Sequence, residues 1–227
     1  MTPDEQKRAA GEAAAALVEA GMIVGLGTGT TAAWFVQALA ARRLAVRCVP
    51  TSEATAALAH SLGLGLEDLD AAGEIDLTVD GADEIGPGLA LIKGAGAALL
   101  REKLVWIASR RRVVIADASK PVKILGKFPL PVEVVAFGHA TTARRLRAAL
   151  AAAGIEADPT LRLASGAPLV TDSGNVIYDV ACEAISAPSD LAIALKAVTG
   201  VVEHGLFLNL AERALIGTDA GVITLYA

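Results

Sequence analysis

The chain has 227 residues, enough for one large domain or for a domain with a smaller companion. Hydrophobic residues make up 54% and charged residues 20%, a balance that excludes disordered and fibrous proteins. No apolar run reaches the ~18 residues of a membrane span, and the first residues lack the basic-then-apolar order of a signal peptide. Without a span or a signal peptide we expect a cytoplasmic protein. The net charge of −5 gives no general attraction to nucleic acid or membranes, so we expect it to bind neither.

The cysteines and histidines are scattered along the chain. Cys48 and Cys182 lie far apart without zinc-ligand spacing, as in a protein from a reducing compartment. His60, His139 and His204 do not cluster either, which disfavours a histidine metal centre and a Ser-His-Asp triad.

Predicted helices and strands alternate through the first half of the chain. Helices are predicted over residues 4–19, 32–43, 52–61 and 97–108, and strands over residues 22–26, 45–49, 75–79, 89–92 and 112–115. Because these strands are apolar throughout, helices should cover both faces of the sheet that they form. The pattern predicts an α/β fold with an open parallel sheet, whose ligands bind beyond the carboxyl ends of the strands.

The order of the elements changes after about Pro129. Strands are predicted over residues 132–137, 155–163, 169–180 and 201–207, and helices over residues 141–153 and 189–198. This βαββαβ order is that of the ferredoxin-like split unit. One more strand, over residues 221–226, should return to the first sheet. We therefore expect a ferredoxin-like α+β domain of residues 131–207, inserted into a catalytic domain of residues 1–130 plus 208–227.

A loop rich in glycine and threonine follows the first predicted strand. Its glycines let backbone N–H groups approach an anion, and threonine hydroxyls add donors where the next helix begins. The loop residues concerned are Thr28, Gly29, Thr30 and Thr31. This composition favours a phosphate site, although threonines that cap a tight turn would look the same. The loop also fits the loose G-x-G-x-x-A pattern of a dinucleotide turn, with Glu53 about 20 residues on.

A cluster of carboxylates follows the predicted strand over residues 75–79. Asp80 and Asp83 flank Gly81 and Ala82 on a turn, where both carboxylates can face one cleft. Such carboxylates can hold sugar hydroxyls, move a proton or bind magnesium. An Asp-rich turn that caps its own backbone is an equal alternative.

Two lysines and a glutamate complete the candidate residues. Lys93 precedes a turn of small residues, Gly94, Ala95 and Gly96, where a lysine can neutralise an oxyanion and the small residues admit a substrate. Glu102 lies on the following helix, and the local sequence favours a surface charge there over a catalytic base. Lys120 follows another predicted strand, a position that is usually solvated but that repeats the placement of the other clusters.

Because all these clusters follow strands of one parallel sheet, they should converge on one edge of it. An anion cradle, carboxylates and lysines, without a nucleophilic cysteine or a redox centre, suit proton transfer on a small phosphorylated sugar. The runs GLGTGTTA, TSEAT, DLTVDGADE, LIKGAGAALLREK and ADASK closely resemble ribose-5-phosphate isomerase of the A type, over essentially the whole chain. Thr30 stands where that family often has serine and Ala95 where it often has glycine, and neither change removes a group that the chemistry needs.

The resemblance implies interconversion of ribose 5-phosphate and ribulose 5-phosphate in the pentose phosphate pathway, without a metal or redox cofactor. It also implies a Rossmann-like domain with a small α+β domain, in agreement with the order of the predicted elements, and a homodimer or homotetramer.

Carried over position by position, the resemblance also implies a role for each candidate residue. Glu102 would be the base that moves the proton between C1 and C2, and Lys93 would stabilise the enediolate. Asp80 and Asp83 would bind sugar hydroxyls and assist ring opening. The substrate and its phosphate would be held by Lys7, Thr28, Gly29, Thr30, Thr31, Gly81, Ala82, Gly94, Ala95, Gly96 and Lys120.

Two other functions remain open at this point. A sugar-phosphate sensor would keep the threonine loop but has little use for Glu102 with both lysines, and it should carry a DNA-binding helix pair that no segment supplies. A dinucleotide-dependent dehydrogenase would keep the glycines and Glu53.

Overall fold

The computed structural model describes residues 1–227 and divides into two compact units. The first unit comprises Met1–Ala82, Arg101–Pro121 and Asn209–Ala227, and the second comprises Asp83–Leu100 and Val122–Leu208. The predicted domain boundaries differ from these units, because residues 83–100 and 122–130 were assigned to the catalytic domain but lie in the second unit. The chain therefore passes between the units more often than the prediction of a single insertion implies.

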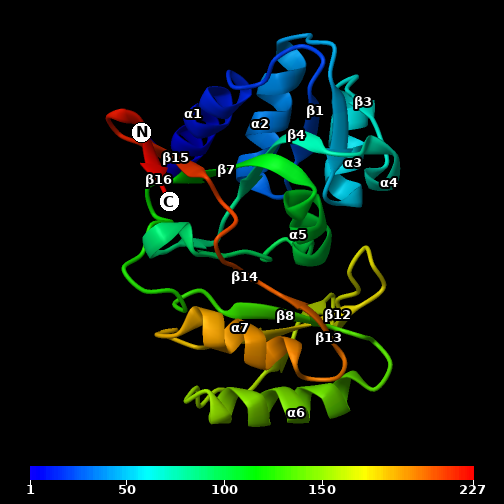
Figure 1. Cartoon of the computed structure of the whole chain (residues 1–227), viewed down its shortest axis with the longest axis vertical. Helices are drawn as coiled ribbons and strands as arrows, with labels where there is room; N and C mark the ends of the chain where they lie inside the picture. The colour runs from blue at the N-terminus through cyan, green and yellow to red at the C-terminus, as the bar shows by residue number, and fades with distance from the viewer. The chain divides into compact units, whose positions relative to one another are not determined.

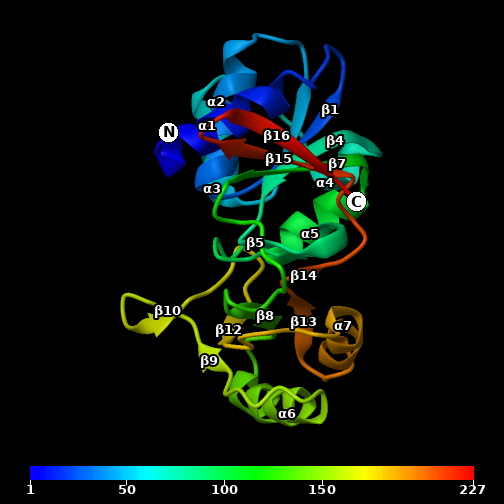
Figure 2. The ribbon, with the colours of Figure 1, turned by 90° about the vertical axis from the view of Figure 1, so that its left-hand side faces the viewer.

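A seven-stranded sheet forms the centre of the first unit, with the strand order β16-β15-β7-β4-β1-β2-β3. The strands are β1 Ile23–Leu26, β2 Arg47–Pro50, β3 Gly65–Leu66, β4 Ile75–Gly81, β7 Ser109–Asp117, β15 Arg213–Thr218 and β16 Gly221–Tyr226. All neighbours pair in parallel except β15 and β16, which are antiparallel (Figure 2). The parallel part has the strand order of a Rossmann fold. The predicted Rossmann-like sheet and the return of the last strand to it are confirmed.

Helices cover both faces of this sheet. They are α1 Pro3–Ala15, α2 Thr30–Ala41, α3 Glu53–Ser61, α4 Leu69–Ala72 and α5 Leu99–Ile107, of which α5 begins in the second unit. On one face α1 and α2 lie side by side (Figure 1), and Ala14 and Phe35 pack in one core cluster with Leu26 and Val79 of the sheet. On the other face Val105 of α5 packs with Ile23, as expected for strands whose side chains alternate between faces. No helix is long and apolar enough to span a membrane.

Several ends of elements in the first unit differ from the predictions. Helix α1 ends at Ala15 rather than at residue 19. The guanidinium of Arg42 donates hydrogen bonds to the carbonyl of Ala15, the last residue of the helix, and to that of Val18, three residues further on. Helix α2 begins at Thr30 rather than at residue 32, because Gly29 is its N-cap. Strand β15 was not predicted; its residues are buried between β7 and β16 and show no alternating pattern.

The second unit contains a four-stranded antiparallel sheet with the order β13-β8-β12-β9. The strands are β8 Leu130–Val134, β9 Thr160–Leu161, β12 Val176–Val180 and β13 Val201–His204, and the helices are α6 His139–Ala152 and α7 Pro188–Lys196. With the strands numbered from one to four along the chain, the order is 4-1-3-2, which is that of a ferredoxin-like unit, so this prediction is confirmed. Leu146 of α6 and Leu195 of α7 pack with Val132 in the core of the unit.

Shorter elements complete the second unit. Strands β10 Leu163–Ala164 and β11 Ala167–Pro168 form a hairpin that stands away from the four-stranded sheet (Figure 2). A third sheet has the order β14-β6-β5, from β5 Glu84–Ile85, β6 Leu91–Ile92 and β14 Leu206–Phe207, with the 3-10 helix Pro87–Leu89 between β5 and β6. The prediction that residues 89–92 form a strand of the parallel sheet is wrong, because β6 pairs antiparallel with both neighbours in this separate sheet.

Candidate active site

The threonine loop joins β1 to α2 in the first unit. Gly27 N–H donates to Val79 O (2.9 Å), and Gly29 has a φ of 101°, which glycine adopts without the strain that a side chain would cause. A Cβ on Gly27 would lie 2.2 Å from the Asp80 carboxylate. The loop therefore needs glycine at residue 27 because it packs directly against Asp80.

The Thr28 hydroxyl belongs to a cluster of hydroxyl groups beneath this loop. Its Oγ1 lies 2.7 Å from Thr51 Oγ1, 2.8 Å from Ser52 Oγ and 3.1 Å from Thr55 Oγ1. Thr55 Oγ1 in turn donates to Gly27 O (3.0 Å). The cluster fixes the shape of the loop, so a ligand at Thr28 would meet mainly its backbone. The signal for it was the run TSEAT, which was noted only as part of the family resemblance.

Asp80 is the second-to-last residue of the central strand β4 and is fully buried. Its Oδ1 accepts hydrogen bonds from Thr28 N–H (3.1 Å) and Gly81 N–H (2.7 Å). The Cβ of Thr31 lies 3.9 Å from the position that a Cβ on Gly81 would take. The structure thus brings Thr28, Thr31, Asp80 and Gly81 together, and the Asp80 carboxylate links the two loops.

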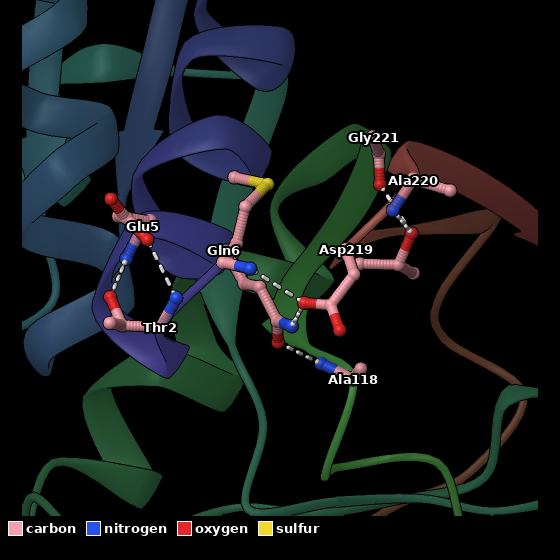
Figure 3. A network of polar contacts seen from close by, with 9 residues as sticks. Thr2, Glu5, Gln6, Ala118, Asp219, Ala220 and Gly221 are labelled. Atoms are coloured by element: carbon pink, nitrogen blue, oxygen red, sulfur yellow. Dashed lines mark hydrogen bonds and ion pairs between the residues drawn. The ribbon is translucent and has the colours of Figure 1, made fainter.

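Gln6, which the sequence analysis did not single out, ties three segments of the first unit together (Figure 3). Its Nε2 donates to Asp219 Oδ1 (2.9 Å) between β15 and β16, and its Oε1 accepts a hydrogen bond from Ala118 N–H (3.1 Å) after β7. The first turns of α1 are thereby fixed beside the end of β7. These two segments carry Lys7 and Lys120.

Lys7 and Lys120 both lie near the end of β7. Lys7 Nζ donates to Thr30 Oγ1 (3.3 Å), so this lysine reaches the threonine loop. Burial tends to raise the pKa of Asp117, but hydrogen bonds from Ser119 and the charges of Lys120 and Lys7 bring that pKa below its ordinary value. The influence of both lysines on one carboxylate places positive charge beside the loop that was predicted to bind phosphate.

Glu102 lies in the first turn of α5 and is only 3% exposed. Its neighbour Arg101 instead points to the surface and pairs with Glu53 (2.7 Å between Nη1 and Oε1). The interpretation of Glu102 as a surface charge is therefore wrong. Residue count alone could not decide this, because it does not give the face of the helix that packs inward.

The lysine loop, residues 93–96, belongs to the second unit. Lys93 is 2% exposed, its N–H donates to Gly205 O (2.9 Å), and its Nζ lies 5.4 Å from the centre of the Phe207 ring. Gly94 has a φ of 119°, and a Cβ there would lie 2.9 Å from Leu99. A buried ammonium over an aromatic face is held by a cation–π contact as well as by its backbone.

Asp83 and Glu84 are adjacent in sequence, but their carboxylates bind different segments of the second unit. Asp83 N–H donates to Ile92 O (2.8 Å), and its Oδ2 accepts a hydrogen bond from the N–H of Ala95 (2.9 Å), an exposed residue of the lysine loop. Glu84 is buried and accepts hydrogen bonds from Gly126 N–H (2.7 Å) and Phe128 N–H (2.6 Å). Glu84 thus holds a neighbouring chain segment in place, whereas Asp83 is joined to the lysine loop.

Each unit therefore assembles part of the predicted set of residues. The first unit holds Lys7, Thr28, Gly29, Thr30, Thr31, Asp80, Gly81, Ala82, Glu102 and Lys120, and the second holds Asp83, Lys93, Gly94, Ala95 and Gly96. No group of three or more His, Cys, Asp or Glu side chains is arranged to hold a metal ion.

Comparison with known proteins gives one consistent result. Residues 47–221 match the family model of ribose 5-phosphate isomerase A (phosphoriboisomerase A). The chain is 67% identical to ribose-5-phosphate isomerase A of Caulobacter sp. (strain K31), over 99% of both chains. It superposes on the ribose 5-phosphate isomerase A of Methanocaldococcus jannaschii with a TM-score of 0.92 and 37% identity, over 100% of both chains. A D-ribose-5-phosphate isomerase solved in complex with phospho-erythronic acid has a TM-score of 0.92 and 34% identity, again over 100% of both chains.

Proposed function

Since the chain belongs to the ribose 5-phosphate isomerase A family and is an aldose–ketose isomerase, we propose that it interconverts D-ribose 5-phosphate and D-ribulose 5-phosphate through an enediolate, without a metal ion. The observation that carries this proposal is the burial of Glu102, because a carboxylate 3% exposed at the start of a helix has no role as a surface charge. The sensor and dehydrogenase alternatives are set aside, because relatives similar over the whole chain are named as isomerases.

The reaction needs a base and a group that stabilises negative charge. In the proposed mechanism Glu102 takes the C2 proton of the open-chain aldose, and the electrons move to the C1 oxygen to give an enediolate. Glu102 then returns the proton to C1, while a hydroxyl proton passes from O2 to O1. Lys93 stabilises the charged oxygen, and it acts on the transition state more than on the ground state because the charge develops only there.

The carboxylates have the task of ring opening and of holding sugar hydroxyls. We assign this task to Asp80 and Asp83, since each already accepts hydrogen bonds from a loop of its own unit and so has a fixed orientation.

The phosphate is assigned to the threonine loop. Gly29 and Thr30 are exposed at the N-terminus of α2, where backbone N–H groups favour an anion. Lys7 contacts this loop, and the charges of Lys7 and Lys120 both lower the pKa of Asp117. A relative that binds phospho-erythronic acid accepts a phosphate together with a carboxylate, as the proposed phosphate and enediolate require.

The remaining expectations are part of the same proposal. We infer that the enzyme works in the pentose phosphate pathway of the cytoplasm, as a homodimer or homotetramer, without a redox cofactor and without binding nucleic acid or membranes. Its substrate is a small phosphorylated sugar.

The first experiment measures ribulose 5-phosphate formed from ribose 5-phosphate in the presence of EDTA. We expect full activity. Loss of turnover with EDTA and its recovery with magnesium would contradict the proposed role of Asp80 and Asp83 as metal-free carboxylates.

The second experiment replaces Glu102. Glu102→Gln keeps the size of the side chain but removes the base, so kcat should fall by at least ~10²-fold while ribose 5-phosphate still binds. Exchange of the C2 hydrogen with deuterated solvent should stop as well. Glu74→Gln, on an exposed glutamate paired with Arg110, is the matched control and should leave both unchanged. Normal turnover and exchange in Glu102→Gln would move the base to another residue.

A further inference from the structure

Arg162 lies in the second unit between β9 and β10, and its backbone is fixed on both sides. Its N–H donates to Ile177 O (2.8 Å) and its carbonyl accepts a hydrogen bond from Leu169 N–H (2.9 Å). Its side chain is 14% exposed and forms a bidentate pair with Asp179, with 2.8 Å between Nε and Oδ2 and a second bond from Nη2 to Oδ1. The guanidinium therefore has a single, well-defined orientation.

The third nitrogen of this guanidinium holds the lysine loop. Arg162 Nη1 donates to Gly94 O (2.8 Å) and to Ala95 O (3.2 Å). One side chain thus connects a carboxylate on β12 with two successive carbonyls of the loop. A planar guanidinium can do this because its three nitrogens point in different, fixed directions, whereas lysine offers a single nitrogen.

These carbonyl contacts set the direction of two N–H groups. All peptide bonds of the chain are trans, so each N–H points opposite to the carbonyl of its own peptide. The carbonyl of Gly94 shares a peptide with the N–H of Ala95, and this N–H indeed points away from Arg162 to Asp83 Oδ2 (2.9 Å). By the same geometry the carbonyl of Ala95 directs Gly96 N–H away from Arg162.

We infer that Arg162, held by Asp179, is a positioning residue of the active site. It orients the Gly94–Ala95 and Ala95–Gly96 peptides, and through Ala95 N–H it orients the Asp83 carboxylate. This inference rests on the proposed function, which assigns Asp83 and the lysine loop to the substrate. Because its charge is neutralised by Asp179, Arg162 acts through geometry, unlike Lys93, whose charge acts on the substrate.

A purely structural role is the alternative explanation, since the pair also joins the start of the hairpin to β12. The two explanations differ in what a conservative replacement does. Arg162→Lys keeps a positive charge beside Asp179 but has one nitrogen in place of three, so it cannot keep both bonds to Asp179 and both carbonyl bonds in their present geometry. A structural role predicts a lower thermal midpoint with unchanged kinetics of the folded protein. A positioning role predicts slower turnover at an unchanged midpoint.

The experiment measures kcat, KM and thermal midpoint for Arg162→Lys and Asp179→Asn. We expect kcat to fall about 10²-fold in Arg162→Lys, since misplacement by about 1 Å has such an effect, with a smaller change in KM. Asp179→Asn keeps the arginine but loosens its orientation, so its kcat should fall less. Arg147→Lys is the matched control, because Arg147 pairs with Asp158 at the surface of the same unit (3.0 Å), and it should match the wild type.

The outcomes separate this inference from the proposed function. A wild-type chain without isomerase activity refutes the proposed function. An active wild type, with folded Arg162→Lys and Asp179→Asn variants that keep its kcat and KM, refutes the positioning role alone. If both variants unfold at the assay temperature while Arg147→Lys does not, the pair serves the fold, and the inference is likewise overturned.

Discussion

The two loops assigned to the substrate are held in opposite ways. In the first unit, the threonine loop is fixed by short side chains of adjacent elements: Thr28 Oγ1 bonds with hydroxyls of Thr51, Ser52 and Thr55, and Thr28 N–H donates to Asp80. In the second unit, the lysine loop is fixed by the charged pair of Arg162 and Asp179, which lies far along the chain.

The difference follows from the architecture of each unit. Parallel strands bring β1, β2 and β4 together with their carboxyl ends in register, so that short side chains such as serine and threonine can reach across. The lysine loop instead leaves a two-residue strand, β6, whose neighbours β5 and β14 both run antiparallel, so their carboxyl ends do not lie beside the loop. A long side chain from β9–β10 has to reach it. A regular sheet thus supports a loop locally, whereas an irregular segment needs a long-range contact.

The largest effect is expected from adding a side chain at Gly27, where the threonine loop packs directly against Asp80. Gly27→Ala would place a Cβ 2.2 Å from a carboxylate that the loop itself surrounds, so the loop must move. We expect a loss of ~3 kcal/mol in the free energy of unfolding, at the upper end for overpacking, together with most of the activity. Urea unfolding and an isomerase assay measure both.

The control for this prediction is Gly65→Ala in β3, where the nearest atom to an added Cβ is Val46 O at 3.7 Å, an ordinary contact. It should keep wild-type activity. If Gly27→Ala unfolds at the same urea concentration as Gly65→Ala, the loop is more adaptable than its hydroxyl cluster suggests.

A smaller effect is expected from removing one hydroxyl of the cluster. Thr28→Val keeps the shape of the side chain but leaves buried hydroxyls without one of their partners, so the free energy of unfolding should fall by about 1–2 kcal/mol. Thr31→Val should instead raise KM more than it lowers kcat, because phosphate binding is largely equal in the ground and transition states. Steady-state kinetics and urea unfolding of both variants check this contrast. A KM effect confined to Thr28→Val would reverse the two assignments.

Local patterns predicted the regular parts of the fold well. The apolar strands such as β1 and β4 and the turns after them follow from short stretches of sequence, and so does the βαββαβ order of the second unit. Strand β15 was missed because its apolar run covers only residues 214–216, between Arg213 and Gly217, and is too short to be told from other short apolar stretches. The strand at residues 89–92 was assigned to the wrong sheet because pairing depends on partners distant in the chain, here Leu206 and Phe207.

In the candidate site, too, local sequence patterns predicted some residues, while others depend on contacts with distant segments. Gly29 and the threonines could be predicted as an anion site because a strand, a glycine-rich turn and a helix in sequence are enough to suggest one. The burial of Glu102 could not be predicted, since the face of α5 that packs inward depends on the tertiary structure. Gln6, Arg162 and Asp179 were missed for a related reason: each acts on a segment far from it in sequence, and a single polar residue carries no local pattern.

The two units should also respond to pH with opposite signs. Burial raises the pKa of Glu133 in the second unit, although Thr171 and Asn175 donate hydrogen bonds to its Oε1 (2.9 Å each). The folded state therefore holds the proton more tightly than the unfolded state. The stabilisation is complete below the ordinary pKa of about 4.5 and is lost as pH rises through the raised pKa.

Glu133→Gln lacks this titration, so the variant should gain stability relative to the wild type as pH rises from 4 to 7. Urea unfolding at several pH values measures the difference, with the exposed Glu156→Gln in the same unit as the control.

Asp117 in the first unit has a lowered pKa, so its stabilisation is present above its ordinary pKa and is lost as pH falls. Asp117→Asn should therefore lose stability relative to the wild type as pH rises towards the ordinary pKa of 3.8, and the difference should stay constant at higher pH. Parallel curves for the two variants would contradict the opposite signs.

The smallest effect concerns the thiols, one in each unit. Burial raises the pKa of Cys48 in β2 to about 12 and that of Cys182 to about 11, and Cys48 is fully buried while Cys182 is 8% exposed. Because the thiolate is the reactive form, both should resist iodoacetamide at neutral pH until urea unfolds the protein. In the native protein Cys182 should react first, since opening of the second unit exposes it more readily than opening of the parallel sheet exposes Cys48. Mass spectrometry of the two labelled peptides measures the order, and faster labelling of Cys48 would show that the unit with the more regular sheet is the one that opens first.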